Sequence, residues 1–295
     1  MNRLASLTGV AGSLKDHYWS LIKDRQTFLL TLTGIAGYLC QRPVPIDWIR
    51  LSSFGGSLFI TISGCTVLNM LFDRDIDRKM TRTNRRPLAT GQVSVFNAAC
   101  LAGVLLSLGL LWALTLSRLC FILILGGASL DVLVYTLWLK RRTAWSIFLG
   151  GLSGGMPILT GRVLAVGRID MVGLLLALAI LFWIPSHNLT LDMLYPADYL
   201  EAGIPTFPYR YGSTATHLMV MLSCLLTAVL MVVLSNRLDL HWLVVAFFSA
   251  SGLGLVGLAF YSWMRVSKQA VAILFKYSSF YMLAGMLLLS LAGLM

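Results

Sequence analysis

The sequence predicts an all-α integral membrane protein with nine transmembrane helices. Three observations predict this class. The mean hydropathy of +0.81 is far above that of a soluble protein. Of the 295 residues, 58% are hydrophobic and only 12% are charged. The apolar residues also fall into runs of roughly 20, the length that an α-helix needs to cross a bilayer.

Each apolar run ends at a polar break, and these breaks define the expected helices in order. The first, at 27–41, is the shortest, and the second, at 51–72, leads into a strongly charged segment. Residues 1–25 carry scattered charge and no compact apolar run before a small-residue cleavage site, so we expect the first helix to be retained. The other helices are expected at about 95–115, 118–138, 144–163, 170–187, 217–235, 240–262 and 271–293.

The net charge of +11 is typical of nucleic-acid binding proteins, but its placement indicates membrane topology instead. If the N-terminus is cytoplasmic, the inner loops hold 17 of the 23 Lys and Arg residues. The outer loops then hold Arg42, Arg50, Arg118, Arg162, Arg168 and Arg237. By the positive-inside rule we expect a multi-pass protein of the cell membrane with a cytoplasmic N-terminus, and no nucleic-acid partner.

No polar stretch is long enough to form a soluble domain, so we expect one transmembrane domain over residues 1–295. Two long loops, 73–94 and 188–216, fall on the same cytoplasmic side, which predicts a single active face there. The two loops resemble each other in their order of acids, basic residues and turn residues. We interpret residues 69–94 (the first motif region) and 188–212 (the second motif region) as a weak internal duplication.

The first motif region holds oxygen-bearing side chains at a spacing of four. Asn69, Asp73 and Asp77 lie on one helical face, where they suit a hard cation such as Mg²⁺. Asp75 points to another face and is expected to be a charge partner. The alternative is a solvated helix end in which the acids pair with neighbouring basic residues. The basic residues that follow suit a diphosphate: Arg78, Arg82 and Arg86.

The second motif region repeats this chemistry. Asn188 and Asp192 are four residues apart, and Asp198 follows in a turn. The alternative is a polar patch that lines a cavity. If the two acidic clusters face each other, each can hold one Mg²⁺ ion on a shared substrate diphosphate, which makes two ions.

Further candidates lie at the same membrane face. Tyr135, Lys140 and Arg141 close the fourth expected helix, either as a topology anchor or as contacts to a metal-bound diphosphate. Arg25, at the start of the first helix, is another basic candidate. His187 precedes the second cluster and is either structural or a contact to the acceptor.

Two features inside the expected helices are open to more than one interpretation. Asp131 lies about two turns inside the fourth helix, where it either contacts a polar partner in a cavity or tunes a metal site. Four glycines form small-x3-small pairs, which favours close helix packing, with a smooth wall for a hydrocarbon tail as the alternative: Gly150, Gly151, Gly154 and Gly155.

These motifs resemble the UbiA superfamily of intramembrane prenyltransferases, and within it the heme O synthase branch, over about residues 18–212. The first motif is similar almost letter for letter: Asn69-x3-Asp73-x-x-Ile76-Asp77-x-x-Met80-x-Arg82-Thr83-x-x-Arg86-Pro87-Leu88. The other similar segments are Tyr135-Thr136-x-x-Leu139-Lys140-Arg141-Arg142-Thr143, Gly150-Gly151-x-x-Gly154 and Asp198-Tyr199-x-x-Ala202-Gly203-Ile204-Pro205.

The chain departs from that branch at several positions. The branch's Trp-Thr-Pro-Pro-His-Phe reads Trp183-Ile184-Pro185-Ser186-His187-Asn188 here, and Asp131 stands where an aromatic residue is expected. The position of Asp192 is usually apolar in heme O synthases. Asn188 and Asp192 look more like the second acidic motif of superfamily members that prenylate quinone precursors or archaeal lipid headgroups.

The resemblance implies nine helices around a central cavity and Mg²⁺-dependent transfer of an isoprenyl group from an isoprenyl diphosphate. Diphosphate departure leaves an allylic carbocation, which an acceptor in the bilayer attacks. The implied acceptor is protoheme IX, or alternatively an aromatic quinone precursor or an archaeal glycerophosphate lipid. The implied metal ligands are Asn69, Asp73, Asp77, Asn188, Asp192 and Asp198, and Lys140 joins the four acids as a catalytic residue.

A remote alternative is a cation-coupled transporter, in which Asp131 and Asp192 would be ion sites. That class predicts broken helices with acids near the middle of the membrane. Most acids here lie at one edge beside arginines, so the sequence favours the enzyme.

Overall fold

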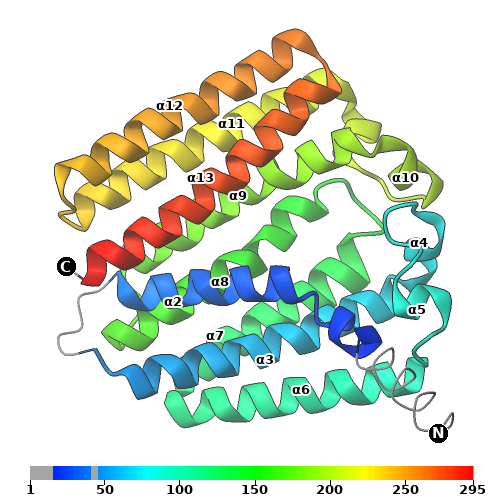
Figure 1. Cartoon of the computed structure of the whole chain (residues 1–295), viewed down its shortest axis with the longest axis horizontal. Helices are drawn as coiled ribbons and strands as arrows, with labels where there is room; N and C mark the ends of the chain where they lie inside the picture. Colours follow the sequence, from blue (N-terminus) through cyan, green and yellow to red (C-terminus); the bar gives the residue numbers. More distant parts are fainter. Residues whose placement is uncertain (1–15, 41–45, 295) are drawn as a thin grey trace, which may run out of the picture.

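Eight helices of the described residues are long and apolar enough to cross a membrane, which confirms the all-α multi-pass class. The computed structural model describes residues 16–40 and 46–294. Figure 1 shows these helices lying side by side in one bundle. They are α3 (Trp48–Phe72), α6 (Val95–Leu116), α7 (Arg118–Ser129) continued by η1 (Leu130–Leu139), α8 (Ser146–Val166), α9 (Met171–Leu194), α11 (Phe207–Arg237), α12 (Trp242–Arg265) and α13 (Lys268–Leu294).

The first expected helix corresponds to α2 (Asp24–Leu39), which has 16 residues. At 1.5 Å per residue it is about 24 Å long, less than a hydrocarbon core of about 30 Å, so nine transmembrane helices stay a prediction. The helix lies inside the bundle against α3, α8 and α13. A methyl group added at Gly37 would collide with the main-chain oxygen of Ile158, so the absence of a side chain permits this close crossing with α8.

Helix α9 extends seven residues beyond the expected end at 187. Pro185 lies inside the helix without ending it, and the break comes at Tyr195, directly before Pro196 at the start of α10 (Pro196–Glu201). Asn188 and Asp192 therefore lie within a regular helix. Helix α11 begins ten residues earlier than expected and contains a kink at Gly212, whose φ is +81°.

The fourth expected helix is not α-helical throughout. Its last ten residues form the π-helix η1, in which hydrogen bonds join residues five apart rather than four. The pattern continues to the end, where the Lys140 N–H donates to the Tyr135 carbonyl at 2.9 Å. The wider turn changes which side chains share a face, and an apolar run alone does not reveal it.

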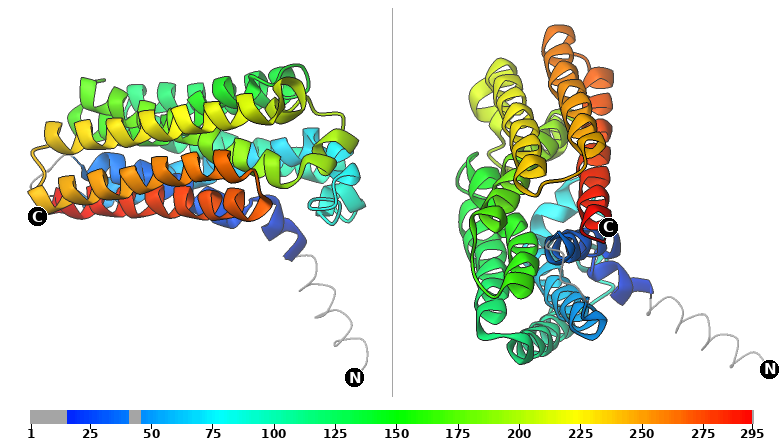
Figure 2. Two further views of the ribbon diagram at one scale, coloured as in Figure 1. Left: turned by 90° about the horizontal axis from the view of Figure 1, so that it is seen from above. Right: turned by 90° about the vertical axis from the view of Figure 1, so that its left-hand side faces the viewer.

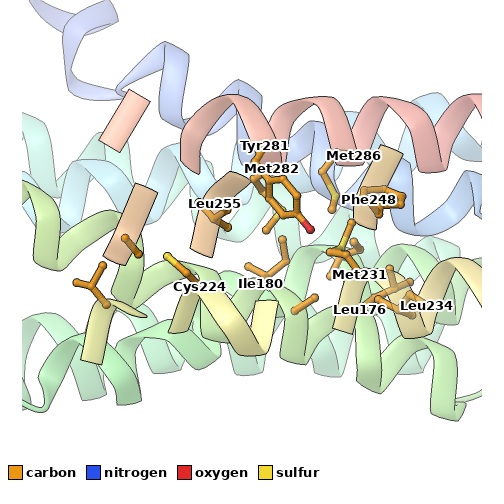
Figure 3. Packing of buried hydrophobic residues seen from close by; sticks show 14 of the residues in the cluster. Leu176, Ile180, Cys224, Met231, Leu234, Phe248, Leu255, Tyr281, Met282 and Met286 are labelled. Atoms are coloured by element: carbon orange, nitrogen blue, oxygen red, sulfur yellow. The ribbon is translucent and has the colours of Figure 1, made fainter. Parts of the chain in front are cut away.

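The core of the bundle consists of apolar side chains from neighbouring helices. Figure 3 shows one cluster in which Leu176 of α9, Met231 of α11, Phe248 of α12 and Tyr281 of α13 meet. A second cluster joins α2, α3, α6, α7 and α8. The predicted close packing at the four glycines is present, since a methyl group at Gly155 would lie 2.8 Å from the Ala177 main-chain oxygen on α9.

The two motif regions meet at one end of the bundle, which we call the motif end. Figures 1 and 2 show α4 (Arg74–Lys79), α5 (Pro87–Thr90) and α10 gathered there, opposite the C-terminus. Ile76 and Met80, in and after α4, pack against Ile204 after α10, and all three side chains are buried. This small core fixes the two regions relative to each other.

Candidate active site

Asp73 is the first acid of the site and follows directly after α3. It caps the C-terminal end of that helix, where its N–H donates to the Asn69 carbonyl. Its buried carboxylate forms an ion pair with Lys140, at the end of η1, through Oδ2. Oδ1 is also buried and has no hydrogen-bond partner among the described residues. Oδ2 of Asp73 therefore pairs with Lys140, whereas Oδ1 is available to a ligand.

Asp77 lies one turn further, in α4, and is also buried. Arg86, just before α5, donates from Nη1 to both carboxylate oxygens at 2.9 and 2.8 Å. The Thr83 hydroxyl donates to the main-chain oxygen of Asp77 at 3.3 Å. The segment between α4 and α5 thus folds back on itself and presents Arg86 beside the acid.

Asp75 points away from Asp73 and Asp77, as its position in the sequence predicts. Arg141 donates to both of its carboxylate oxygens, at 2.8 and 2.7 Å, and these hydrogen bonds lower the pKa of Asp75 to about 2. Arg141 also donates to the Phe72 carbonyl at the end of α3. The structure confirms Asp75 as a charge partner, while a contact of Arg141 with substrate stays a prediction.

Asp198 links the second motif region to the first. The Thr81 hydroxyl donates to its Oδ1 at 2.7 Å, and the Arg82 N–H donates to Oδ2 at 3.3 Å. The hydrogen bond from Thr81 is the main reason that the pKa of Asp198 lies below its ordinary value. The two motif regions are therefore joined by polar contacts as well as by their shared apolar core.

Asp192 lies near the end of α9 and is buried, with no ion pair among the described residues. Its Oδ2 is buried without a hydrogen-bond partner in the described part of the chain. The Tyr199 hydroxyl of α10 faces this carboxylate, and burial together with the charge of Asp192 raises the pKa of Tyr199. Asn188 is half-buried one turn earlier on the same helix. Asp192 therefore differs from Asp73 and Asp77, each of which is ion-paired with a described basic residue.

Asn69 is held by two residues of η1. Its Nδ2 donates to Asp131 Oδ2 at 2.9 Å, and its Oδ1 accepts from the Thr136 hydroxyl at 2.8 Å. The sequence left Asp131 either with a polar partner in a cavity or beside a metal site. The structure gives it the polar partner, and that partner is itself a predicted metal ligand.

His187 occupies an aromatic stack rather than an open face. Its ring lies between those of Trp183 and Phe275, with centroids 4.8 and 4.4 Å away, and its Nδ1 lies 3.2 Å from the Ser279 hydroxyl. These contacts favour the structural interpretation of the histidine. A contact with the acceptor stays a prediction.

The other predicted substrate-binding residues have varied surroundings. Arg25 is exposed at the start of α2, and Arg78 donates from Nε to the Ala89 carbonyl at 2.8 Å. The Arg82 guanidinium lies 6.0 Å from the Tyr195 ring centroid. The Lys140 ammonium lies 5.9 Å from the ring centroid of Tyr135, so this ring lies close to the Asp73 ion pair.

Lys23 belongs to the site, and the sequence reasoning missed it. The residue caps α2 in a left-handed conformation, with φ of 45°. Burial, followed by the nearby charges of Arg86 and Lys140, lowers its pKa to about 8. The available signal was its position at the same membrane face, two residues before Arg25. Three basic side chains thus converge near Asp73, which is the arrangement of an anion-binding site.

A cavity lies inside the bundle between α2, α3, α7, η1 and α8, and Asn69 in its lining is four residues before Asp73. The empty space along its lining is about 570 Å³, part of which is open to the outside. Gln26, Asn69 and Asp131 line it nearest the motif end, whereas Leu58, Ile124 and other apolar residues line it further along the helices. A charged head at the motif end and a hydrocarbon tail in the bundle would match this distribution.

The acids fit a hard divalent cation. Asp73 Oδ1 and Asp192 Oδ2 are buried carboxylate oxygens that lack a partner among the described residues, and such oxygens are costly unless a ligand satisfies them. Within residues 16–40 and 46–294, no three acid, histidine or cysteine side chains group into a complete metal site. A cation here would complete its shell with amide, water or substrate oxygens, as Mg²⁺ commonly does.

Comparisons with known proteins agree with this geometry. A model of the UbiA prenyltransferase family matches residues 30–291. The protoheme IX farnesyltransferase of Thermofilum pendens is 38% identical over 208 residues, which cover 70% of this chain and 72% of that protein. A structure of digeranylgeranylglyceryl phosphate synthase has a TM-score of 0.79 at 20% identity, covering 94% of this chain and 98% of that one. A UbiA homolog from Archaeoglobus fulgidus bound to DMAPP and Mg²⁺ has a TM-score of 0.72 at 16% identity, covering 92% and 98%.

Proposed function

The chain belongs to the UbiA prenyltransferase family, and we propose that it transfers an isoprenyl group from an isoprenyl diphosphate to an acceptor in the membrane. The observation that carries the proposal is the position of the charges. Lys23, Lys140 and Arg86 converge on Asp73 and Asp77, which follow Asn69 of the cavity lining by four and eight residues.

The basic side chains bind the diphosphate in this proposal. Lys140 and Arg86 are already oriented by their ion pairs with Asp73 and Asp77, so they lose little conformational freedom when the donor binds. Lys23 adds a third positive charge from α2. The predicted contacts of Arg25, Arg78, Arg82 and Arg141 would surround this centre.

Two Mg²⁺ ions are proposed, one held by Asn69, Asp73 and Asp77 and one by Asn188, Asp192 and Asp198. The orphaned oxygens of Asp73 and Asp192 support one ligand in each set. When bound, Mg²⁺ would supply positive charge that stabilises the departing diphosphate. The structure of a homolog with DMAPP and Mg²⁺ supports the same pairing of donor and metal.

The reaction then follows from the separation of polar and apolar surfaces. The bond between the allylic carbon and the diphosphate oxygen breaks, and its electron pair leaves with the diphosphate, which the basic residues stabilise. The cavity residues keep bulk water from the allylic cation. An electron-rich carbon of the acceptor supplies the electron pair of the new carbon–carbon bond, or, where the acceptor is a glycerophosphate lipid, a hydroxyl oxygen supplies that of a carbon–oxygen bond. The positive charge left on the acceptor is then discharged by loss of a proton, directly or after a water molecule has added.

Protoheme IX is the acceptor that we favour, because relatives named protoheme IX farnesyltransferase are 34–38% identical to this chain. Aromatic quinone precursors and archaeal glycerophosphate lipids are the alternatives, because Asn188 and Asp192 depart from the heme O synthase pattern. The excess of basic residues at the motif end supports a cytoplasmic active face in the cell membrane.

The experiment is a competitive acceptor assay with purified protein, Mg²⁺ and farnesyl or geranylgeranyl diphosphate. Products are identified by mass spectrometry. We expect diphosphate release and a prenylated protoheme IX. Prenylation of an aromatic or glycerophosphate acceptor alone would retain prenyl transfer and reject the heme acceptor, and no prenylated product with any acceptor would reject the proposal.

A further inference from the structure

Asp131 is an acid inside the bundle that the proposed chemistry does not use. It lies on η1 and lines the cavity, and none of the ion pairs formed by the described residues includes it. Acids within membrane-spanning helices are costly and rarely serve packing alone. In the described structure, the Asp131 carboxylate accepts one hydrogen bond, from Asn69. Its role is therefore expected to involve Asn69.

Asp131 and Thr136 together hold both ends of the Asn69 side chain. Asp131 Oδ2 accepts from Nδ2, and the Thr136 hydroxyl lies 2.8 Å from Asn69 Oδ1 and 2.9 Å from the Asp131 carbonyl. Residues five apart share a face in a π-helix but lie about 140° apart around an α-helix. The π-helical turn is therefore what allows both residues to reach the same amide.

The chemistry of the two partners determines which way the amide faces. The two ends of an Asn amide have nearly the same shape, so hydrogen-bond partners decide its orientation. A carboxylate only accepts hydrogen bonds, and it therefore requires the Nδ2 end of Asn69. The Oδ1 end then lies beside the Thr136 hydroxyl. The hydrogen bond from that hydroxyl uses one of the two lone pairs of Oδ1 and leaves the other for a ligand.

We propose that Asp131 is a positioning residue which, with Thr136, fixes Asn69 so that its carbonyl oxygen is presented to the metal of the donor. The inference rests on the proposed function, because it needs a metal-bound diphosphate beside Asn69. Partners that orient a metal ligand commonly change metal affinity when they are removed. Asp131 acts through Asn69 and needs no contact with donor or acceptor.

The test measures metal-dependent donor binding without turnover. The thiolo analogue of farnesyl diphosphate does not ionise readily, and its binding is followed as thermal stabilisation of the purified protein over a Mg²⁺ titration. Asp131→Leu removes the acceptor for Nδ2. We expect the Mg²⁺ concentration for half-maximal stabilisation to rise about tenfold or more, while the KM for the acceptor stays unchanged.

Two further variants keep the test decisive if Asp131→Leu folds poorly. Thr136→Val preserves shape and removes the hydrogen bond to Asn69 Oδ1. It should shift the Mg²⁺ dependence in the same direction by a smaller factor. Ser63→Ala is the matched control, because Ser63 is buried on α3, the helix of Asn69, but lies outside the cavity lining, and its hydroxyl donates to the Phe59 carbonyl. It should leave the titration as in the wild type.

The outcomes separate the two proposals. A wild-type Mg²⁺ dependence in the folded Asp131 and Thr136 variants overturns the positioning role. A change confined to the acceptor KM also overturns it, and assigns Asp131 to acceptor binding. If the wild-type protein itself shows no Mg²⁺-dependent stabilisation by the analogue, the proposed function fails, and the positioning role fails with it.

Discussion

The first and second motif regions carry the same types of side chain but balance their charges differently. In the first, every acid has a basic partner: Asp73 with Lys140, Asp75 with Arg141 and Asp77 with Arg86. In the second, Asp198 is satisfied by Thr81 and the Arg82 N–H, which belong to the first region, and Asp192 faces Tyr199. None of the ion pairs among the described residues involves an acid of the second region.

This difference in ion pairing indicates that the two motif regions have different roles. In the proposed function, the ion pairs of the first region hold its acids and basic side chains in place for a diphosphate and its metal. The second region has a buried Asp192 carboxylate with no ion pair among the described residues, so fewer basic side chains depend on its acids. We therefore expect substitutions in the first region to have the larger effects and those at the contact between the regions to have smaller ones.

The largest effect is expected for Asp73→Asn. The change removes a charge beside Lys140 and a candidate metal ligand while preserving shape, so kcat/KM should fall about a thousandfold. The measurement is product formation at saturating Mg²⁺, with thermal unfolding to verify the fold. Wild-type turnover would contradict the assignment of Asp73.

Asp75→Asn is the matched control, two residues away on the exposed side of α4. It removes an ion pair that is largely solvated, so the unfolding free energy should change by less than about 1 kcal/mol. Turnover should be close to that of the wild type. A large loss in this variant would show that charge anywhere on α4, rather than the position of Asp73, governs activity.

Asp192→Asn should have the next largest effect, a loss of about a hundredfold in kcat/KM. The buried, unpartnered oxygen is replaced by a neutral amide, which binds a metal less well. The Mg²⁺ concentration for half-maximal activity should rise at the same time. If activity and Mg²⁺ dependence are both unchanged, the first region suffices and the two-metal arrangement is wrong.

Thr81→Val tests the contact between the two regions. It removes a hydrogen bond to the Asp198 carboxylate, and bonds to charged groups contribute about 1.5 kcal/mol or more, so kcat/KM should fall about tenfold. Thr90→Val is the control, because the Thr90 hydroxyl donates to main-chain oxygens of Arg86 and Pro87 at the same end of the bundle. Equal losses in both variants would argue against a specific coupling through Asp198.

The smallest effect is the pH dependence expected from Lys23. Its pKa of about 8 means that the free enzyme loses this charge as the pH rises through 8, so kcat/KM for the donor should decline several-fold there. Arg86 and Lys140 lower this pKa, whereas Asp73 and Asp131 raise it. A Lys23→Arg variant should retain the charge and give a flat profile over this range.

Stability should change in the opposite sense over the same pH range. Because the folded pKa of Lys23 lies below the unfolded value of 10.5, the unfolded chain binds more protons between pH 8 and 10.5. The contribution of Lys23 to the unfolding free energy therefore grows as the pH rises through this window.

The two effects of Lys23 are tested separately. A donor affinity that does not change between pH 7 and 9 would contradict a role for Lys23 in binding the diphosphate.

Local patterns in the sequence were sufficient to predict where several of the candidate residues lie. The spacing of Asn69, Asp73 and Asp77 indicated a shared face, and two of them are buried acids at the motif end. Asp75 was assigned to another face for the same reason, and it does pair with Arg141. Such predictions succeed because helical periodicity fixes side-chain direction without reference to the rest of the chain.

Other features depended on contacts between distant segments. The hydrogen bond between Thr81 and Asp198 joins residues that are 117 positions apart, and no local pattern indicates it. The end of α9 was placed too early because residues 188–216 were assigned to a loop, whereas the helix continues through Asn188 and Asp192 to Leu194. Lys23 was overlooked because its neighbours Arg86 and Lys140 come from other parts of the sequence.

The sequence by itself determined the membrane class, the order of the apolar helices and the chemistry of the two motif regions, because hydropathy and helical spacing are local properties. Only the tertiary structure decided which acid pairs with which basic residue, how α4 packs against α10, and that a π-helical turn brings Asp131 and Thr136 to the same amide. Those choices depend on the packing of segments far apart in the chain, where the free energy of many contacts overrides the preference of any single segment.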